Sequence, residues 1–329
     1  MADLTTSYLG LKLKNPLVVA PNPLCEFVGN LQRMETVGAG AVVLQSLFEE
    51  QVAIDNLGPK ALQLDELPHN LRHLPQADLF THDAGSYLAH IVQAKQVLNI
   101  PVIASLNGYY AGGWVEYAQL IEASGADALE LNVYYLETKG TVSGRELEQM
   151  YLDLVTRVKE SVDIPVAVKL SPYFTGMAYF LRKLDETGID GMILFNRFYQ
   201  PDIDLDSESF VPSLALSNQE ELRLRLRWTA LLAGKLNADI AITGGVHDFG
   251  DVVKCLLAGG QVAMMATAVL EHGIDYLAEV VAGLDKWLDD RGYASVGEIN
   301  GRLAQHNVKD ASALERANYM RVLKSFGKE

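Results

Sequence analysis

"PVAVKLSPYF" (165–174) is an apolar run that ends in one lysine and a proline-containing turn. An almost unbroken run of valine and alanine is typical of a strand that is buried on both faces of a parallel sheet. Lys169 therefore stands at the end of a buried strand. Because lysine is rarely buried without a partner, an ammonium group at this place indicates a use for its charge.

Seven more apolar runs of the same kind occur along the chain. The eight predicted strands are 16–20, 41–46, 101–106, 128–133, 165–170, 191–196, 239–244 and 262–267. Segments with helical periodicity separate them, and glycines in "VGAGA" (37–41) and "ASGADA" (123–128) mark helix C-termini. Eight strand–helix units predict an α/β fold of the (β/α)8 TIM barrel type. A doubly wound sheet is the alternative, because the sequence alone does not show that the sheet closes.

Three segments fall outside this repeat. "TTSYLGLKLKNP" (5–16) is predicted to form an N-terminal hairpin that closes the bottom of the barrel, and residues 47–90 form a long polar insertion after strand 2. The C-terminal tail from Gly301 onward is predicted to be helical and to pack on the outside of the barrel or on a partner. Its apolar positions at helical spacing are Leu314, Ala317, Met320 and Leu323. Since no linker divides the chain, residues 1–329 are predicted to form a single domain.

The composition excludes several classes of protein. The chain has 329 residues, of which 49% are hydrophobic, and a net charge of −15. So acidic a chain has no overall attraction for nucleic acid or for an anionic membrane surface. No apolar run reaches the roughly 20 residues that cross a bilayer, and the N-terminus does not resemble a signal peptide. We expect a protein that binds neither nucleic acid nor membrane.

The cysteines and histidines do not predict a metal site. Cys25 and Cys255 are far apart, and neither belongs to a CxxC pair. Iron–sulfur and zinc sites need clustered thiolates, so neither is expected, and two isolated cysteines fit a reducing cytoplasm. His69 and His73 stand four residues apart with His82 nearby, but no complete set of ligands is fixed.

Polar side chains collect at the predicted C-terminal ends of the strands, where a barrel of this type carries its chemistry. They are Gln45, Ser46, Asn107, Asn132, Tyr134, Tyr135, Lys169, Asn196 and Arg197. The seventh strand runs into "TGGV" (243–246), whose glycines let the backbone approach a ligand closely. With Thr267 after the eighth strand, this loop predicts a phosphate site, and the alternative is a tight turn without a ligand.

Two further patterns leave alternatives open. Lys169 beside a phosphate-anchored cofactor could stabilise negative charge on a ring, or it could pair with Glu130 or reach solvent. A Schiff-base lysine, as in barrel aldolases, is another possibility. In "ELRLRLRW" (221–228), three arginines alternate with leucine, which predicts either a strand-like edge near the cofactor or a solvated edge. They are Arg223, Arg225 and Arg227.

At these residues the chain resembles the dihydroorotate dehydrogenases, which are FMN-binding (β/α)8 barrels. The similarity extends in order over almost the whole chain. It rests on "LGLKLKNPLVVA", "GADALELN", "VAVKLSPYF", "TGGV" and "RGYASVGEINGRL". "LFNRFYQPDIDL" and "ERANYMRVL" look like the branch described only as dihydroorotate dehydrogenase-like.

The resemblance implies which residues hold the cofactor FMN and the substrate. The implied cofactor contacts are Ala20, Pro21, Gln45, Ser46, Asn107, Asn132, Lys169, Asn196, Thr243, Gly244, Gly245, Ala266 and Thr267. The implied substrate contacts are Asn132, Glu137, Asn196 and Arg197. Lys169 matches the flavin-contacting lysine of the family, and with Tyr135 it is predicted to be catalytic.

The departures from the family pattern concern the substrate. Tyr135 stands where the family has a cysteine or serine base, and Glu137 stands at the position of a substrate-binding asparagine. Gln45 replaces a second lysine, and Arg197 replaces a serine. The ordinary pKa of tyrosine is about 10, against about 8.5 for cysteine, so Tyr135 suits a general acid better than a base. The alternative is that Tyr134 or Tyr135 only covers the flavin.

The predicted function is that of an FMN-dependent oxidoreductase in the cytoplasm, acting on a CH–CH bond of a small cyclic or activated substrate. Dihydroorotate, orotate or another pyrimidine-like compound is the expected substrate class. The alternatives are a Schiff-base lysine aldolase or isomerase on a phosphorylated substrate, and a flavin-binding protein without turnover. By analogy with soluble members of the family, a homodimer is expected. The sequence does not identify the electron acceptor.

Overall fold

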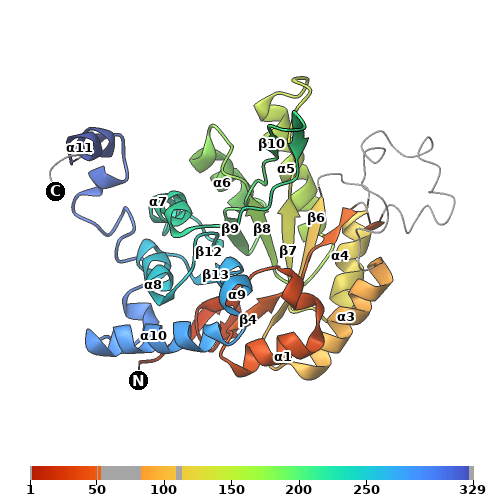
Figure 1. The fold of residues 1–329 in the computed structure, drawn as a ribbon, viewed down its shortest axis with the longest axis horizontal. Helices are drawn as coiled ribbons and strands as arrows, with labels where there is room; N and C mark the ends of the chain where they lie inside the picture. Colours follow the sequence, from red (N-terminus) through yellow and green to blue (C-terminus); the bar gives the residue numbers. More distant parts are fainter. Residues whose placement is uncertain (1, 50, 53–82, 109–112, 326–329) are drawn as a thin grey trace.

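A closed barrel of parallel strands forms the centre of the molecule. The structure, a computed structural model, describes residues 2–49, 51–52, 83–108 and 113–325 (Figure 1). The barrel strands in this part of the chain are β3 (Leu17–Val19), β4 (Ala41–Val43), β6 (Val102–Gly108), β7 (Ala128–Val133), β8 (Val166–Leu170), β9 (Gly191–Leu194), β12 (Asp239–Thr243) and β13 (Val262–Met265). Because β4 pairs with both β3 and β6, the sheet closes. The predicted (β/α)8 barrel is confirmed, each predicted strand is present, and the doubly wound alternative is excluded.

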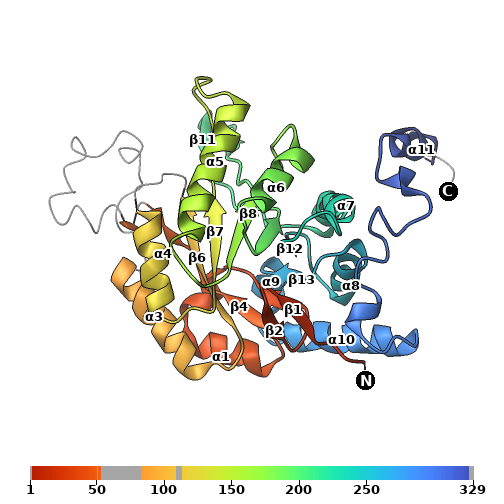
Figure 2. The same cartoon turned by 180° about the vertical axis from the view of Figure 1, so that it is seen from behind.

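Helices surround the barrel on its outer side (Figures 1 and 2). The described helices are α1 (Val28–Thr36), α3 (Ala84–Val97), α4 (Trp114–Ala123), α5 (Gly144–Lys159), α6 (Met177–Asp185), α7 (Leu222–Leu232), α8 (Phe249–Ala258), α9 (Thr267–His272), α10 (Tyr276–Asp290) and α11 (Ala317–Ser325). None of these combines the length and the apolar character needed to cross a bilayer.

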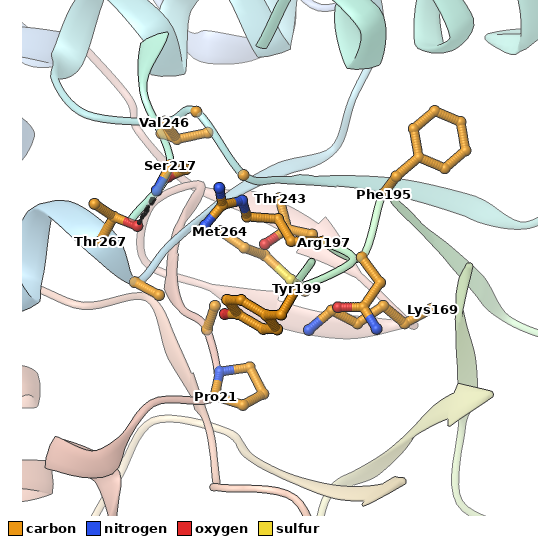
Figure 3. A pocket seen from close by; sticks show the side chains of 15 residues that line it. Pro21, Lys169, Phe195, Arg197, Tyr199, Ser217, Thr243, Val246, Met264 and Thr267 are labelled. Atoms are coloured by element: carbon orange, nitrogen blue, oxygen red, sulfur yellow. Dashed lines mark hydrogen bonds between the residues drawn. The ribbon is translucent and has the colours of Figure 1, made fainter. Parts of the chain in front are cut away.

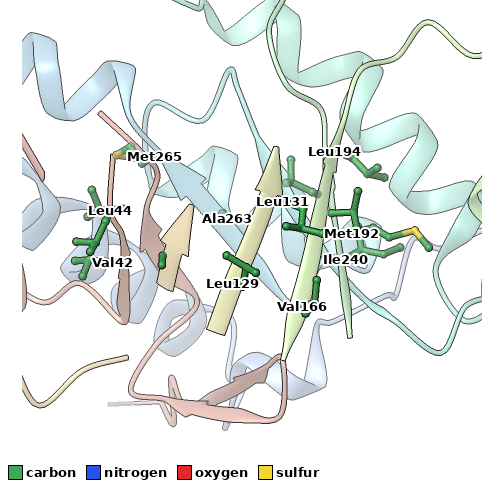
Figure 4. Packing of buried hydrophobic residues seen from close by; sticks show 14 of the residues in the cluster. Val42, Leu44, Leu129, Leu131, Val166, Met192, Leu194, Ile240, Ala263 and Met265 are labelled. Atoms are coloured by element: carbon green, nitrogen blue, oxygen red, sulfur yellow. The ribbon is translucent and has the colours of Figure 1, made fainter. Parts of the chain in front are cut away.

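The strands bury two separate apolar layers. Leu129, Leu131 and Leu194 point outward and pack under the helices, as Figure 4 shows. Ala128 and Ala167 belong to a second cluster inside the barrel. Successive residues of a strand face opposite sides of the sheet, so each β7 side chain enters one layer or the other. A fully buried leucine contributes about 1.5–3 kcal/mol relative to an exposed one.

The N-terminal hairpin closes the bottom of the barrel, as predicted. Strand β1 (Thr6–Tyr8) pairs antiparallel with β2 (Leu11–Leu13), and Tyr8 and Leu9 belong to the inner apolar cluster. The backbone amide of Leu9 donates to Asp239 Oδ2 at 2.8 Å. A Cβ at Gly191 would lie only 2.5 Å from Leu9 Cδ2, so this glycine leaves room for the hairpin tip.

The insertion after strand 2 is described only at its ends. Strand β5 (Leu47–Phe48) adds to β6, and helix α3 already begins at Ala84, where Asp83 caps it. The last seven residues of the expected insertion, 84–90, thus already form about two turns of helix α3. Residues 53–82 lie outside the described residues, and with them the histidine group that was considered for a metal. That group is His69, His73 and His82.

The arginine-rich segment is a helix, so the predicted strand-like edge is wrong. Asn218 and Glu221 form a capping box around a short 3-10 helix, Gln219–Glu221, and α7 follows at once. In the helix, Arg225 is buried under the barrel end, while Arg223 is exposed. The buried positions Leu222, Arg225 and Thr229 follow the helical period, so the alternation of arginine and leucine does not separate the buried face from the exposed one.

The C-terminal tail is helical in its last part, at Ala311–Ala313 and in α11, whereas residues 301–310 form turns and not the helix expected from Gly301 onward. Helix α11 stands apart from the barrel (Figures 1 and 2). Arg227 Nε donates to the carbonyl oxygen of Leu314 at 2.9 Å and ties the segment before α11 to α7. The apolar side chains of Met320 and Leu323 are 58% and 59% exposed. At these two positions, therefore, the predicted stripe remains mostly exposed in the described part of the chain.

Candidate active site

A cavity of about 90 Å³ opens at the C-terminal ends of β3, β8, β9, β12 and β13 (Figure 3). The predicted site residues that line it are Ala20, Pro21, Lys169, Asn196, Arg197, Thr243, Gly244, Gly245, Ala266 and Thr267. The structure thus brings ten of the predicted residues together, from segments up to 247 positions apart. This convergence follows from the barrel, because the carboxyl ends of parallel strands meet on one face.

Two asparagines extend this group of residues beyond the cavity lining. Asn107, Asn132 and Lys169 are neighbours in register across β6, β7 and β8, so their side chains share the inner face. Asn196 Nδ2 donates to Asn132 Oδ1 at 2.7 Å. Asn132 is therefore bonded to a lining residue, although neither it nor Asn107 lines the cavity itself.

Lys169 is buried and has a carboxylate partner. Only 7% of the residue is exposed, and its Nζ donates to Glu130 Oε1 at 3.3 Å. Glu130 is completely buried inside the barrel. The ion pair considered from the sequence is present, and the solvent-facing alternative is excluded. An ammonium group has three N–H donors, so the pair does not exhaust the hydrogen-bonding capacity of a side chain that also lines the cavity.

The loop after β12 has the backbone that the sequence predicted. Gly244 and Gly245 adopt φ angles of +84° and +82°, which favour glycine. A Cβ at Gly244 would lie 2.7 Å from Arg225 Nη2, and one at Gly245 would lie 2.6 Å from the backbone nitrogen of Leu222. Within the described part of the chain, the amides of residues 244–246 donate to no other residue. Unbonded amides at the edge of a cavity can bind an anion.

Two arginines place positive charge behind this loop. Arg225 Nε donates to the carbonyl oxygen of Thr243 at 2.8 Å, and its Nη1 donates to that of Glu221 at 2.7 Å. Arg197 holds the Glu221 carboxylate through two bonds of 3.0 and 3.1 Å. Burial lowers the pKa of Arg225. Arg197 and Arg225 thus share the single carboxylate of Glu221, and these three side chains together carry one excess positive charge.

Arg225→Met is expected to lower the free energy of unfolding by about 3–5 kcal/mol, because buried acceptors lose a charged donor. Urea unfolding measures the change. Arg223→Met is the matched control on the same helix: Arg223 is exposed, so its replacement should change the value by at most about 0.5 kcal/mol. Equal losses in the two variants would contradict a supporting role of Arg225 under the loop.

Thr267 is hydrogen-bonded to Ser217, which no pattern in the sequence indicated as a site residue. Ser217 Oγ donates to Thr267 Oγ1 at 2.8 Å, the bond drawn in Figure 3. Ser217, Phe195, Tyr199 and Val246 also line the cavity. Ser217 is 50 residues from Thr267 and belongs to a loop, so no periodic pattern pointed to it. Met264 lines the cavity too, and the alternation within its strand could have identified it.

The predicted acid and its neighbour lie elsewhere. Tyr135 does not line the cavity; its ring packs against the outer apolar layer, and its hydroxyl donates to Glu137 Oε2 at 2.9 Å. This bond, foremost, lowers the pKa of Glu137. Tyr134 stacks on Phe198 with ring centroids 4.4 Å apart, and burial raises its pKa. The structure therefore does not bring Tyr135 or Glu137 to Lys169.

Gln45 and Ser46 lie beside the barrel interior instead of in the cavity lining. Ser46 Oγ is 2.8 Å from Ser105 Oγ. Gln45 Oε1 is buried and has no hydrogen-bond partner among the described residues. Both side chains come from the end of the second barrel strand, as predicted, but they reach the layer below the cavity.

The cysteines are both buried free thiols. Burial raises the pKa of Cys25 to about 12 and that of Cys255 still further, so neither is a reactive thiolate. In the parts of the chain that the structure describes, no three histidine, cysteine or acidic side chains are grouped as metal ligands.

Comparison with known proteins agrees with this geometry. The family model described as dihydroorotate dehydrogenase matches residues 3–288, which is most of the chain. The chain belongs to the dihydroorotate dehydrogenase family. It is accordingly an enzyme of the oxidoreductase class, and the resemblance seen in the sequence is confirmed.

Three relatives show how far the similarity extends. The catalytic subunit of dihydroorotate dehydrogenase B (NAD(+)) from Pyrococcus abyssi is 30% identical, over 91% of this chain and 98% of its own length. The proteins of the same name from Methanosarcina acetivorans and Methanothermobacter thermautotrophicus are 28% and 26% identical. The alignments cover 89% and 91% of this chain, and 93% and 97% of the relatives. The family similarity thus includes the cavity and the strands that form it.

Proposed function

We propose that residues 1–329 form a single-domain, FMN-dependent oxidoreductase that acts on a CH–CH bond of a small cyclic or activated substrate. Dihydroorotate, orotate or another pyrimidine-like compound is the proposed substrate class. The observation that supports this most is the cavity in which Lys169 faces the glycine loop 243–246 and Thr267. The family of the chain and the names of its relatives support the same class of reaction.

The residues present fit the phosphate end of FMN. Unbonded amides in the glycine loop, the Thr267 hydroxyl and the excess positive charge all favour a phosphate group. The cavity of about 90 Å³ is smaller than the roughly 300 Å³ of sites that enclose a small ligand. The Tyr199 ring lies in the middle of the lining residues in Figure 3. Binding of the whole cofactor therefore requires this ring to move outward.

When bound, FMN supplies the capacity to accept or donate a hydride. In the proposal, Lys169 holds its ammonium against the ring and favours negative charge there. Asn132 and Asn196, joined by their mutual hydrogen bond, orient a polar ring of the substrate beside it. Tyr135 would deliver a proton to the substrate when a double bond is reduced, and as the tyrosinate it would take that proton when a CH–CH bond is oxidised. Either step requires residues 134–142 to turn its hydroxyl from Glu137 toward the cavity. Arg197 acts mainly by holding Glu221 at the wall of the cavity.

Two other functions make different predictions for the same cavity. A Schiff-base aldolase or isomerase would use the Lys169 amine as a nucleophile, and the contact between its Nζ and Glu130 would have to break for that step. A flavin-binding protein without turnover would hold FMN but accept no electrons from any donor. A covalent bond between Lys169 and a carbonyl substrate would therefore distinguish the aldolase from the proposed enzyme. A flavin that no donor reduces would distinguish the protein without turnover.

The absorbance spectrum of the purified protein, reconstituted with FMN, tests the proposal. We expect a yellow protein that binds about one FMN per chain and whose flavin is bleached anaerobically by dihydroorotate or a related dihydropyrimidine. Trapping of a carbonyl substrate on Lys169 by borohydride, without flavin binding, would support the aldolase instead. Flavin that is bound but reduced by no donor would support the protein without turnover.

We further propose a homodimer and a cytoplasmic location. The exposed apolar side chains of α11 need a partner surface, and free buried thiols suit a reducing compartment. Light scattering at micromolar concentration should give twice the chain mass of 36.1 kDa. A mass equal to that of one chain would contradict the dimer.

A further inference from the structure

A row of hydrogen bonds leads from Ser46, just after the second barrel strand, to Lys169 through the interior of the barrel. Ser46 Oγ lies 2.8 Å from Ser105 Oγ, and Ser105 Oγ donates to Glu130 Oε1 at 3.1 Å. The same carboxylate oxygen accepts from Lys169 Nζ at 3.3 Å. Ser46 is partly exposed, whereas Ser105 and Glu130 are completely buried. The row therefore connects a side chain that reaches solvent with one that does not.

The strand register explains this row. Ser105 and Glu130 are direct neighbours across β6 and β7, one layer below the neighbours Asn132 and Lys169 on β7 and β8. Side chains two residues apart on a strand share a face, so the polar layer with Glu130 lies directly beneath the cavity end of the barrel. The hydroxyl groups of Ser105 and Ser46 connect this buried carboxylate to a partly exposed residue.

One of the two carboxylate oxygens of Glu130 makes no hydrogen bond to a described residue. This oxygen, Oε2, is buried. An unpartnered oxygen of a buried carboxylate is costly, and protonation of the group removes most of that cost. The arrangement is therefore suited to a carboxyl group that gains and loses a proton.

The other titratable groups near Glu130 hold their protons. The hydroxyl of Tyr8, from the hairpin, has no hydrogen-bond partner in the described part of the chain, and its pKa is raised well above the usual range by burial, then by Glu130 and Asp239. Tyr87, from α3, also has a pKa raised mainly by burial. Its hydroxyl is bonded to the backbone of Ser105 on both its donor and acceptor sides. Neither tyrosine therefore supplies a proton to Glu130.

We propose that Glu130 takes up a proton through Ser46 and Ser105 when negative charge develops in the cavity above Lys169. The proposal deepens the proposed function and rests on it, because the charge arises when a CH–CH donor reduces bound FMN. Transfer of a hydride brings two electrons and one proton, and leaves one negative charge on the reduced cofactor. Ser105 passes its hydroxyl proton to Glu130 Oε1, Ser46 replaces it, and solvent replaces that of Ser46. The carboxylate becomes a carboxylic acid, so two protons enter the site for two electrons.

The proton uptake has an electrostatic cause. While the cofactor is oxidised, the positive charge of Lys169 balances the negative charge of Glu130. A new negative charge on the cofactor would leave this buried site with one unbalanced negative charge. Neutralising Glu130 lets Lys169 balance the cofactor instead. Glu130 is a positioning residue in this account, since it acts on the cofactor through Lys169.

Spectroelectrochemistry of the FMN-reconstituted protein tests this inference. For a two-electron couple, a tenfold change in proton concentration is worth 29.6 mV per proton, so uptake of two protons gives a slope of about 59 mV per pH unit. We expect that slope for the parent and about half of it for Glu130→Gln. The infrared difference spectrum, reduced minus oxidised, should show the carbonyl stretch of a protonated carboxyl group in the parent and lose it in Glu130→Gln.

Ser105→Ala tests the path itself. It should leave the slope unchanged but slow proton uptake after reduction by at least tenfold, as followed with a pH indicator in stopped flow. Ser171→Ala is the matched control, because Ser171 is also a buried serine at the top of the barrel but lies outside the row.

A one-proton slope in the parent, or no carboxyl band, would overturn the inference even if FMN binds and is reduced. Either result comes from the parent protein, so it does not depend on whether a variant folds. Failure of the protein to bind FMN would instead reject the proposed function, and this inference with it.

Discussion

Lys169→Ala is expected to lower the midpoint potential of bound flavin by about 60–90 mV and to slow its reduction sharply. Loss of one preorganised donor to a developing charge costs about 2.7–4 kcal/mol. For a two-electron couple, 30 mV corresponds to about 1.4 kcal/mol. The sign follows from the charge: without the ammonium group, the reduced and more negative cofactor loses stabilisation. Potentiometric titration and anaerobic stopped flow measure the two effects.

This variant needs a control for stability, because it leaves Glu130 buried without its cation. Breaking a buried pair by removing one partner costs about 3–5 kcal/mol. The double variant Lys169→Ala/Glu130→Gln removes the unpaired charge and should recover most of that loss, while the low potential persists. A potential and a reduction rate equal to those of the parent would make Lys169 a structural lysine.

Gly244→Val is expected to abolish FMN binding and to destabilise the protein by about 2–6 kcal/mol. A branched side chain at a φ of +84° is strained by about 1–3 kcal/mol, and its Cβ would meet the Arg225 guanidinium at 2.7 Å, adding about 1–3 kcal/mol of overpacking. Relief of the clash moves the loop, and with it the amides proposed to bind phosphate. The flavin-to-protein ratio after reconstitution and urea unfolding measure both effects.

Gly188→Val separates backbone strain from the site. Gly188 has a φ of +80°, but its Cβ would meet nothing within 4 Å, and it does not line the cavity. This variant should lose stability from strain alone and keep its full content of flavin. If Gly244→Val folds and retains full flavin, the phosphate is bound elsewhere.

Much of the fold followed from simple patterns in the sequence. Strands buried on both faces are apolar throughout, so each barrel strand is recognisable in the sequence as an apolar run. Because strands and helices alternate along the chain, the order of the strands around the barrel follows their order in the sequence. Alternate leucines in the arginine-rich segment fit a strand period of two, although the segment forms a helix. The capping box of Asn218 and Glu221 is the local sequence signal for that helix.

Site residues that lie at the ends of strands could be predicted from the sequence. Site residues that lie in loops were harder to predict. Lys169 and Thr243 follow directly from strand ends that must converge. The direction of Tyr135, by contrast, depends on the path of the loop after β7 and on the competing carboxylate of Glu137. Ser217 lies in the long segment between β9 and α7, whose sequence shows no helical or strand periodicity around this residue. Such contacts depend on tertiary packing, which no local pattern encodes.

The sealed floor of the barrel has a kinetic consequence. With Tyr8 and Leu9 filling one end, the ammonium group of Lys169 can be approached only from the other. If an electron donor and an electron acceptor both have to reach the flavin ring proposed beside Lys169, they would have to bind one after the other through the same opening. Steady-state rates measured with both reactants varied should then give parallel double-reciprocal lines, the signature of an enzyme that releases one product before it admits the second reactant.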